Sequence, residues 1–409
     1  MSARRAERML AVIMAVAGVL LLLSLFGVLG SPWPHRPGRA TTTSTTQSTA
    51  PKPDASDPVA TDEEVENDAT DPLVKTGELG ALPLADNDPN ALPAGGTALR
   101  VWPEDPVVPV LREITRESFI GRDYGPQALS GITVIIDAGH GGEDDKGHGA
   151  FGATEQQPIH EKDITLRAAT MFGDRLRALG ATIIYTRPQD TWQSLFYRVA
   201  FAADYVLLAY EEEASLAGFD VEPIRHLRPL MGDIMRINQA SQDSGGRGMF
   251  GHIGTVPELR IIYDVQRQYD DVIFISLQTG FDQDESKRGT RSIYMSNQFI
   301  QEVNNSYAAG QSAATLPPNY TAYKTDDRYR LAGLLQAHMA LTMPELKPGD
   351  EAVREEDMAV LRLTNLTSAV VELGYLSNAE DRALMTDDSS LGEMMQALTN
   401  AVFQYYCVR

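Results

Sequence analysis

The chain has 409 residues, a formal net charge of −21 and a single cysteine. The negative charge argues against a binder of phosphate backbones, because nucleic-acid-binding surfaces are basic. The lone Cys407 excludes an intramolecular disulfide framework and a cysteine-rich zinc module. The first hundred residues differ sharply in composition from the remainder. About three hundred residues follow them, enough for one large core with an insertion.

The N-terminus carries a long apolar segment. Arg4, Arg5 and Arg8 precede an uncharged apolar run over residues 9–30. As a helix this run would be roughly 33 Å long, which matches a hydrocarbon core of about 30 Å. A cleavable signal peptide has a shorter apolar region and a small-residue cleavage site. We therefore predict an uncleaved membrane anchor over residues 1–30, with the rest of the chain extracytoplasmic, since the arginines favour an inside N-terminus.

A linker is predicted over residues 31–97. Its central part is rich in Thr, Ser and Pro and then becomes acidic. Such a composition buries too little apolar surface to offset the entropy of ordering. We expect a disordered, self-repelling tether.

From residue 98 onward, short apolar runs alternate with amphipathic stretches. This alternation predicts an α/β fold with a twisted, mostly parallel sheet and helices on both faces. A mainly helical insertion is expected at about residues 200–270 of this 98–409 domain. Strands are predicted over residues 132–137, 181–186, 272–277, 291–295 and 369–373, and helices over residues 161–179, 331–341 and 391–405.

Several short segments stand at the ends of these elements. The first strand closes with the letters IDAGHGG over residues 136–142, and EKD opens the first long helix at residues 161–163. The middle strand ends in ISLQ at residues 275–278, and the late strand leads into VVELGYLSN at residues 370–378. Together these motifs resemble the zinc-dependent N-acetylmuramoyl-L-alanine amidases, which remove stem peptides from peptidoglycan. The resemblance covers roughly residues 130–405, apart from the insertion.

The resemblance implies a site and a reaction. His140 and Glu161 match two zinc ligands, Glu372 matches the catalytic acid, and Gln278 stands where the family has a third ligand, a histidine. Zinc with an open position activates water and polarises a carbonyl, and a nearby carboxylate moves the proton to the leaving amine. The implied function is a cell-wall hydrolase that cleaves the amide bond between N-acetylmuramic acid and L-alanine.

Gln278 leaves three outcomes open. Its amide oxygen is neutral and hard, better suited to Mg²⁺, Ca²⁺ or Mn²⁺ than to an imidazole's place on zinc. It can ligate zinc weakly, or a neighbour can replace it. In the third case the domain is catalytically impaired and binds peptidoglycan or regulates another hydrolase. The neighbours considered are His148, His160, Asp282 and Asp284.

Two predictions concern geometry. His140, Gln278 and Glu372 are expected at the carboxyl ends of strands, where open α/β sheets place their sites. Ser377 and Glu380 have the spacing of a capping box and are expected to start the next helix. Arg187 and Arg198 are interpreted as structural residues.

Overall fold

The computed structural model describes residues 98–409, with gaps at residues 144, 151–157, 241–245 and 347–351. The anchor predicted over residues 1–30 and the linker predicted over residues 31–97 lie outside the described residues. Within the described part of the chain, no helix combines the length and the apolar character needed to cross a bilayer.

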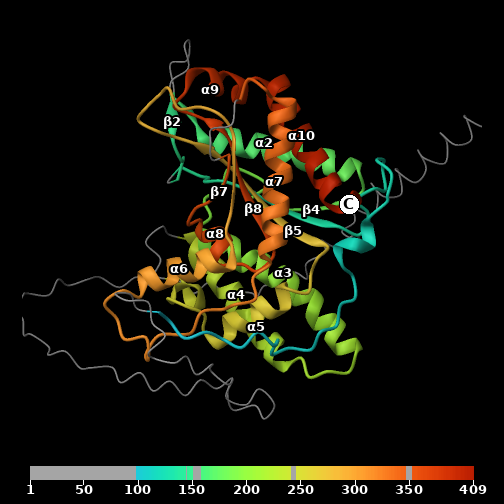
Figure 1. The fold of residues 1–409 in the computed structure, drawn as a ribbon, viewed down its shortest axis with the longest axis vertical. Coiled ribbons are helices and arrows are strands. Elements are labelled where there is room, and N and C mark those ends of the chain that lie inside the picture. The colour runs from blue at the N-terminus through green and yellow to red at the C-terminus, as the bar shows by residue number, and fades with distance from the viewer. Residues whose placement is uncertain (1–97, 144, 151–157, 241–245, 347–351) are drawn as a thin grey trace, which may run out of the picture. The chain divides into compact units, whose positions relative to one another are not determined.

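A six-stranded sheet in the order β4-β1-β5-β8-β6-β7 forms the centre of the fold (Figure 1). Strands β4 (Thr182–Tyr185), β1 (Thr133–Ala138), β5 (Val272–Gly280) and β8 (Thr367–Tyr375) are mutually parallel. Strand β6 (Arg291–Tyr294) is antiparallel to β8, and β7 (Val353–Glu355) is parallel to β6. The predicted mostly parallel sheet is confirmed. The short pair β2 (Gly149–Ala150) and β3 (Ile159–His160) was not predicted.

The central strands are buried on both faces. All six residues of β1 are buried, and Val134 and Ile136 enter one core while Ile135 enters the other. A strand covered on both sides has no need for alternating polar residues, which is why the sequence shows continuous apolar runs.

Helices cover both faces, as predicted. One core contains α2 (Glu161–Ala178), α7 (Thr325–Thr342) and α10 (Asp388–Cys407). The other contains α3 (Leu195–Leu216), α4 (Glu222–Ala240) and α5 (Pro257–Gln266), which span most of residues 200–270, where the insertion was predicted (Figure 1). Shorter elements are η3 (Arg116–Phe119), η4 (Gly248–Gly251), α6 (Asn297–Tyr307), α8 (Ala359–Arg362) and α9 (Ala379–Thr386).

The start of α9 corrects one prediction. The N-cap is Asn378, whose Oδ1 accepts hydrogen bonds from the backbone N–H groups of Glu380 (3.0 Å) and Asp381 (3.1 Å). Ser377 Oγ instead accepts from the backbone N–H of Asp282 at 3.1 Å. The predicted capping box of Ser377 and Glu380 is therefore wrong by one position. Asn and Ser are equally good N-caps, so the sequence alone could not separate them.

A buried ionic network joins the first strands to α3. Asp137, near the end of β1, is fully buried. It accepts hydrogen bonds from Arg198 Nη1 (2.5 Å), Thr186 Oγ1 (2.6 Å) and Ser276 Oγ (2.7 Å). Burial alone would raise the pKa of Asp137, but Arg198 and the two hydroxyl groups hold it below its usual value. The network fixes the strand end that precedes the GHGG turn.

Replacing Asp137 by asparagine is expected to lower the free energy of unfolding by about 3–5 kcal/mol, because the Arg198 charge would remain buried without its partner. Urea unfolding of the full chain measures this. Asp174→Asn is the control, since Asp174 pairs with Arg177 on the surface and exposed pairs contribute less than about 1 kcal/mol. Equal effects of the two substitutions would contradict the role given to Asp137.

Candidate active site

The turn after β1 has a strained conformation. His140 has a φ of 58°. No other non-glycine residue in the described part of the chain has a positive φ. The left-handed conformation costs an L-residue roughly 1–2 kcal/mol. The next residue, Gly141, has a φ of 140°, and a Cβ there would lie 2.3 Å from the Thr191 carbonyl oxygen. The turn thus requires a glycine after the histidine, and strain of this kind is typical of functional sites.

Two buried arginines hold the carbonyl groups of this turn. Arg187 donates from Nε to the Ala138 carbonyl (2.9 Å) and from Nη2 to the Gly139 carbonyl (2.8 Å). Arg198 donates from Nη2 to the His140 carbonyl at 2.7 Å. Burial lowers the pKa of Arg187 to about 10, so it remains charged at neutral pH. Both arginines make the structural contacts that the sequence suggested.

His140 and Glu161 form the centre of the candidate site. His140 Nε2 lies 3.2 Å from Glu161 Oε2, and His140 Nδ1 lies 2.6 Å from Asp145 Oδ1. Glu161 is the first residue of α2, and only 1% of its surface is exposed. Its Oε1 accepts from the backbone N–H of Thr279 (2.7 Å) and its Oε2 from that of His148 (3.2 Å). The carboxylate is therefore fixed from three sides.

His140 and Glu161 each stabilise the charged form of the other. Burial opposes protonation of His140, but its hydrogen bonds to Asp145 and Glu161 outweigh burial and raise the pKa of His140 to about 9. Burial would raise the pKa of Glu161, and the contact with His140 lowers it. A metal ion on Nε2 must therefore displace a proton, so metal affinity should fall as the pH falls.

The structure places Gln278 beside this pair, near the end of β5. Its Nε2 donates to Ser276 Oγ at 3.2 Å, and a Cβ on Gly139 would lie 2.3 Å from Gln278 Oε1. The amide thus lies against the backbone of the turn and joins the Asp137 network through Ser276. Gln278 and Glu372 are register partners on the neighbouring parallel strands β5 and β8. His140, Gln278 and Glu372 accordingly lie at one edge of the sheet, as predicted.

The candidate substitutes for the third ligand have other contacts. The His148 ring stacks on Phe281, with ring centroids 4.4 Å apart. Asp282 pairs with Lys287 Nζ at 2.6 Å, and Asp284 accepts hydrogen bonds from Ser286. His160 precedes Glu161 at the N-cap of α2. In the described ranges no three His, Cys, Asp or Glu side chains are grouped so that they could hold a metal ion.

The residues present fit zinc at two of three positions. Two tetrahedral ligand atoms at about 2.1 Å from zinc are roughly 3.4 Å apart, and His140 Nε2 and Glu161 Oε2 are 3.2 Å apart. Metal-bound histidines usually donate their other N–H to a carboxylate, and Asp145 occupies that position. Gln278 offers only an amide where an imidazole would be expected, so the third position does not fit.

Asp145 was not predicted from the sequence, where only a cluster of acids in the loop pointed to it. Asp145→Asn is expected to weaken zinc binding about 10- to 100-fold, as loss of a carboxylate behind a metal-bound histidine usually does. Isothermal titration calorimetry with Zn²⁺ measures the effect. Glu143→Gln is the matched control, because Glu143 is exposed and pairs with Lys146. If both variants bind zinc as the wild type does, Asp145 does not orient His140.

Glu372 lies in β8 and has a charged partner that the sequence did not reveal. Its Oε2 contacts both Nε (2.5 Å) and Nη2 of Arg291, the residue directly opposite it on β6. Burial raises the pKa of Glu372, and Arg291 opposes that shift. A buried carboxyl near a strand end with a raised pKa is suited to proton transfer.

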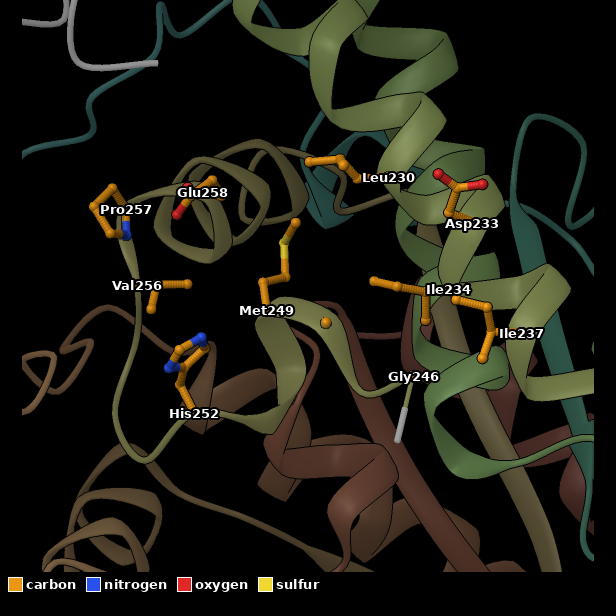
Figure 2. A pocket seen from close by; sticks show the side chains of 11 residues that line it. Leu230, Asp233, Ile234, Ile237, Gly246, Met249, His252, Val256, Pro257 and Glu258 are labelled. Atoms are coloured by element: carbon orange, nitrogen blue, oxygen red, sulfur yellow. The ribbon is translucent and has the colours of Figure 1, made fainter. Parts of the chain in front are cut away.

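A separate pocket of about 670 Å³ lies in the insertion (Figure 2). Leu230 and Ile234 of α4, Met249 of η4 and Val256 before α5 surround it, with Asp233 and Glu258 at its edge. None of the candidate site residues lines this pocket. The strand-end site and the pocket are therefore distinct features.

The fold and the site define a class of protein. A sheet with four parallel strands and helices on both faces carries His140 and Glu372 at its strand ends and Glu161 at the adjoining start of α2. The family model described as N-acetylmuramoyl-L-alanine amidase matches residues 134–209 and 257–404. The chain belongs to this family of hydrolases. The unmatched segment, residues 210–256, is shorter than the insertion predicted at about residues 200–270, and α5 lies in the matched part.

Individual relatives match to different extents. YrvJ of Bacillus subtilis, a candidate N-acetylmuramoyl-L-alanine amidase, is 37% identical over 76 residues, which are 19% of this chain and 14% of YrvJ. YqiI of Bacillus subtilis is 22% identical over 280 residues, which are 68% of this chain and 87% of YqiI. The solved structure of the amidase AmiC2 of Nostoc punctiforme is 18% identical, with a TM-score of 0.39, and the match covers 68% of this chain and 97% of AmiC2. The chain thus spans only a small part of YrvJ.

Proposed function

We propose that this chain hydrolyses the amide bond between N-acetylmuramic acid and L-alanine of peptidoglycan stem peptides. One observation carries the proposal. His140 Nε2 and Glu161 Oε2 are 3.2 Å apart at the strand ends, with Asp145 behind the imidazole, which is the arrangement that a hydrolytic metal site needs. Membership of the amidase family supplies the substrate class.

Zinc is the proposed cofactor. His140 and Glu161 would hold it, and Gln278 would contribute at most a neutral amide oxygen, so binding should be weaker than with three charged or imidazole ligands. If bound by these residues, zinc would polarise the scissile carbonyl and would lower the pKa of water. The chain's own contribution is to present Nε2 in one tautomer, because Nδ1–H donates a hydrogen bond to the Asp145 carboxylate.

Glu372 is the proposed proton carrier. It takes a proton from the attacking water as the water oxygen bonds to the lactyl carbonyl carbon. The carbon–nitrogen bond then breaks, its electron pair remains on nitrogen, and Glu372 returns the proton to the leaving amine of L-alanine. The pKa of Glu372 is raised from its usual value toward neutral pH, which suits a group that first accepts and then returns a proton.

The proposed location is the outer face of a bacterial membrane. The apolar run over residues 9–30, preceded by arginines, supports a single-pass anchor, and the polar stretch up to residue 97 supports a tether of some length. Peptidoglycan lies outside the membrane, so this placement would bring the domain to its substrate. Mass spectrometry of the mature N-terminus tests the anchor, since a cleaved N-terminus would rule it out.

The direct test of the activity uses the full chain and purified peptidoglycan. Release of stem peptides with a free L-alanine amine, together with nearly stoichiometric zinc after dialysis, is the expected result. No metal and no release from the wild type would contradict it.

The second candidate is a catalytically impaired domain that binds peptidoglycan or regulates another hydrolase. Gln278 at the third ligand position specifically favours it. Cosedimentation with purified peptidoglycan, without release of peptides, is the outcome that this candidate requires.

A further inference from the structure

The ion pair between Arg291 and Glu372 assigns different roles to the two oxygens of the carboxyl group. Both Arg291 nitrogens, Nε and Nη2, contact the same oxygen, Oε2. Among the described residues none donates a hydrogen bond to Oε1. Arg291 therefore holds Oε2, whereas no side chain or backbone donor in the described part of the chain holds Oε1.

Arg291 itself is firmly placed. Antiparallel pairing sets it directly opposite Glu372, and Thr290 Oγ1 donates to the Glu372 carbonyl at 2.8 Å. Its guanidinium carbon lies 4.9 Å from the centre of the Tyr375 ring, a distance at which a cation is attracted to the ring face. The side chains of Arg291 and Glu372 are 16% and 12% exposed. A pair this shielded is much less screened than a surface ion pair.

The far side of Glu372 is also defined. A Cβ on Gly280 would lie 3.4 Å from Glu372 Oε2 and 3.3 Å from the Tyr375 ring. The strand pairing is irregular between Gln278 and Gly280, so the end of β5 passes close to the carboxyl. Oε2 thus lies between Arg291 and the backbone of β5.

We propose that Arg291 is the positioning residue of Glu372, holding Oε2 so that Oε1 is the oxygen that exchanges a proton with water and the leaving amine. This inference rests on the proposed amidase function. Arg291 acts through Glu372 and is not itself required to touch the substrate. The amide hydrolysis remains balanced as described, with the transferred proton carried on Oε1.

Two further charges act on Glu372 beside that of Arg291. Arg354 of β7 and Glu356, which follows β7, also influence it, but they pair with each other. Arg354 is therefore a graded control: it is the same residue type on the next strand, it lowers the pKa of Glu372 less than Arg291 does, and it does not contact the carboxyl.

The test compares Arg291→Gln, Arg291→Lys and Arg354→Gln in the full chain. Loss of the cation favours the neutral carboxyl, so the pKa of Glu372 rises and the acidic limb of the pH–rate profile moves up by about one unit or more in Arg291→Gln. The kcat for a soluble muramyl peptide is expected to fall about 10- to 100-fold because the carboxyl is no longer oriented, with KM unchanged. Lysine should restore the acidic limb but not kcat, since it lacks the planar fork of arginine.

A second measurement does not depend on activity. Carbon-13 NMR of the full chain with labelled glutamate carboxyls follows the titration of Glu372, whose resonance is identified by its loss in Glu372→Gln. The titration midpoint should rise most in Arg291→Gln and by less in Arg354→Gln, because Arg354 acts on Glu372 only from a distance. Circular dichroism confirms that each variant is folded.

The outcomes separate the two proposals. An inactive wild type overturns the amidase function and with it the catalytic use of Oε1. The effect of Arg291 on Glu372 is tested separately by the NMR titration. An active wild type whose profile and titration are the same in Arg291→Gln overturns the positioning role alone. A gain of activity in Arg291→Gln also overturns it, because the ion pair would then restrain Glu372.

Discussion

Glu372→Gln is expected to reduce the release of stem peptides from peptidoglycan by about 10²- to 10⁴-fold, the usual contribution of a general acid–base group. The amide has nearly the same shape as the carboxylate but cannot accept the proton of the attacking water. Its oxygen can still accept a hydrogen bond from Arg291, so the packing around β8 should persist. Amine release from purified peptidoglycan measures the rate.

Two controls make the Glu372 result specific. Bound zinc should be nearly the same in Glu372→Gln and the wild type, because Glu372 is not among the proposed ligands. Glu380→Gln changes a carboxylate that is 72% exposed and pairs with Arg288, and it should leave the rate unchanged. If Glu372→Gln retains most of the activity, the proton is carried by another group.

Gln278→His is expected to increase zinc affinity more than about 100-fold. Changing a residue that only supports a metal ligand typically alters the affinity roughly 10- to 100-fold, and this substitution adds a ligand itself. The substitution gives the strand end an imidazole nitrogen, the donor that zinc prefers over an amide oxygen. Gly139 leaves room for the ring, because it has no Cβ where the side chain of residue 278 lies. Titration with Zn²⁺ and measurement of peptide release report binding and activity separately.

Gln278→Asn is the matched control, because it keeps the amide and shortens it. It should not bind zinc more tightly than the wild type. Activity that appears only in Gln278→His would identify the wild type as the impaired domain of the second candidate. Equal zinc affinity in all three proteins would show that residue 278 does not reach the ion.

Much of the fold was predictable because its strands are covered on both faces. The runs around Ile135 and Phe274 are continuous and apolar, and the glycine after α2, Gly180 with a φ of 92°, ends the helix where it was expected. Short edge elements were missed. Strand β7 has three residues, none fully buried, and therefore shows no apolar pattern.

The candidate site was predictable only where local motifs define it. His140, Glu161 and Glu372 lie at element ends that the sequence reveals. Asp145 and Arg291 were missed, because a loop conformation brings the first to His140 and an antiparallel pairing brings the second to Glu372. Neither relationship has a fixed spacing along the chain.

The arginines beneath the GHGG turn have a consequence for ligand capture. Arg187 and Arg198 immobilise the carbonyl groups of three consecutive residues, ending with that of His140. A flexible loop would lose conformational entropy on binding an ion, and that loss would weaken binding. In this chain the turn is already fixed when the protein folds. Binding an ion therefore costs little further conformational entropy, and little of the affinity of the donor atoms is lost.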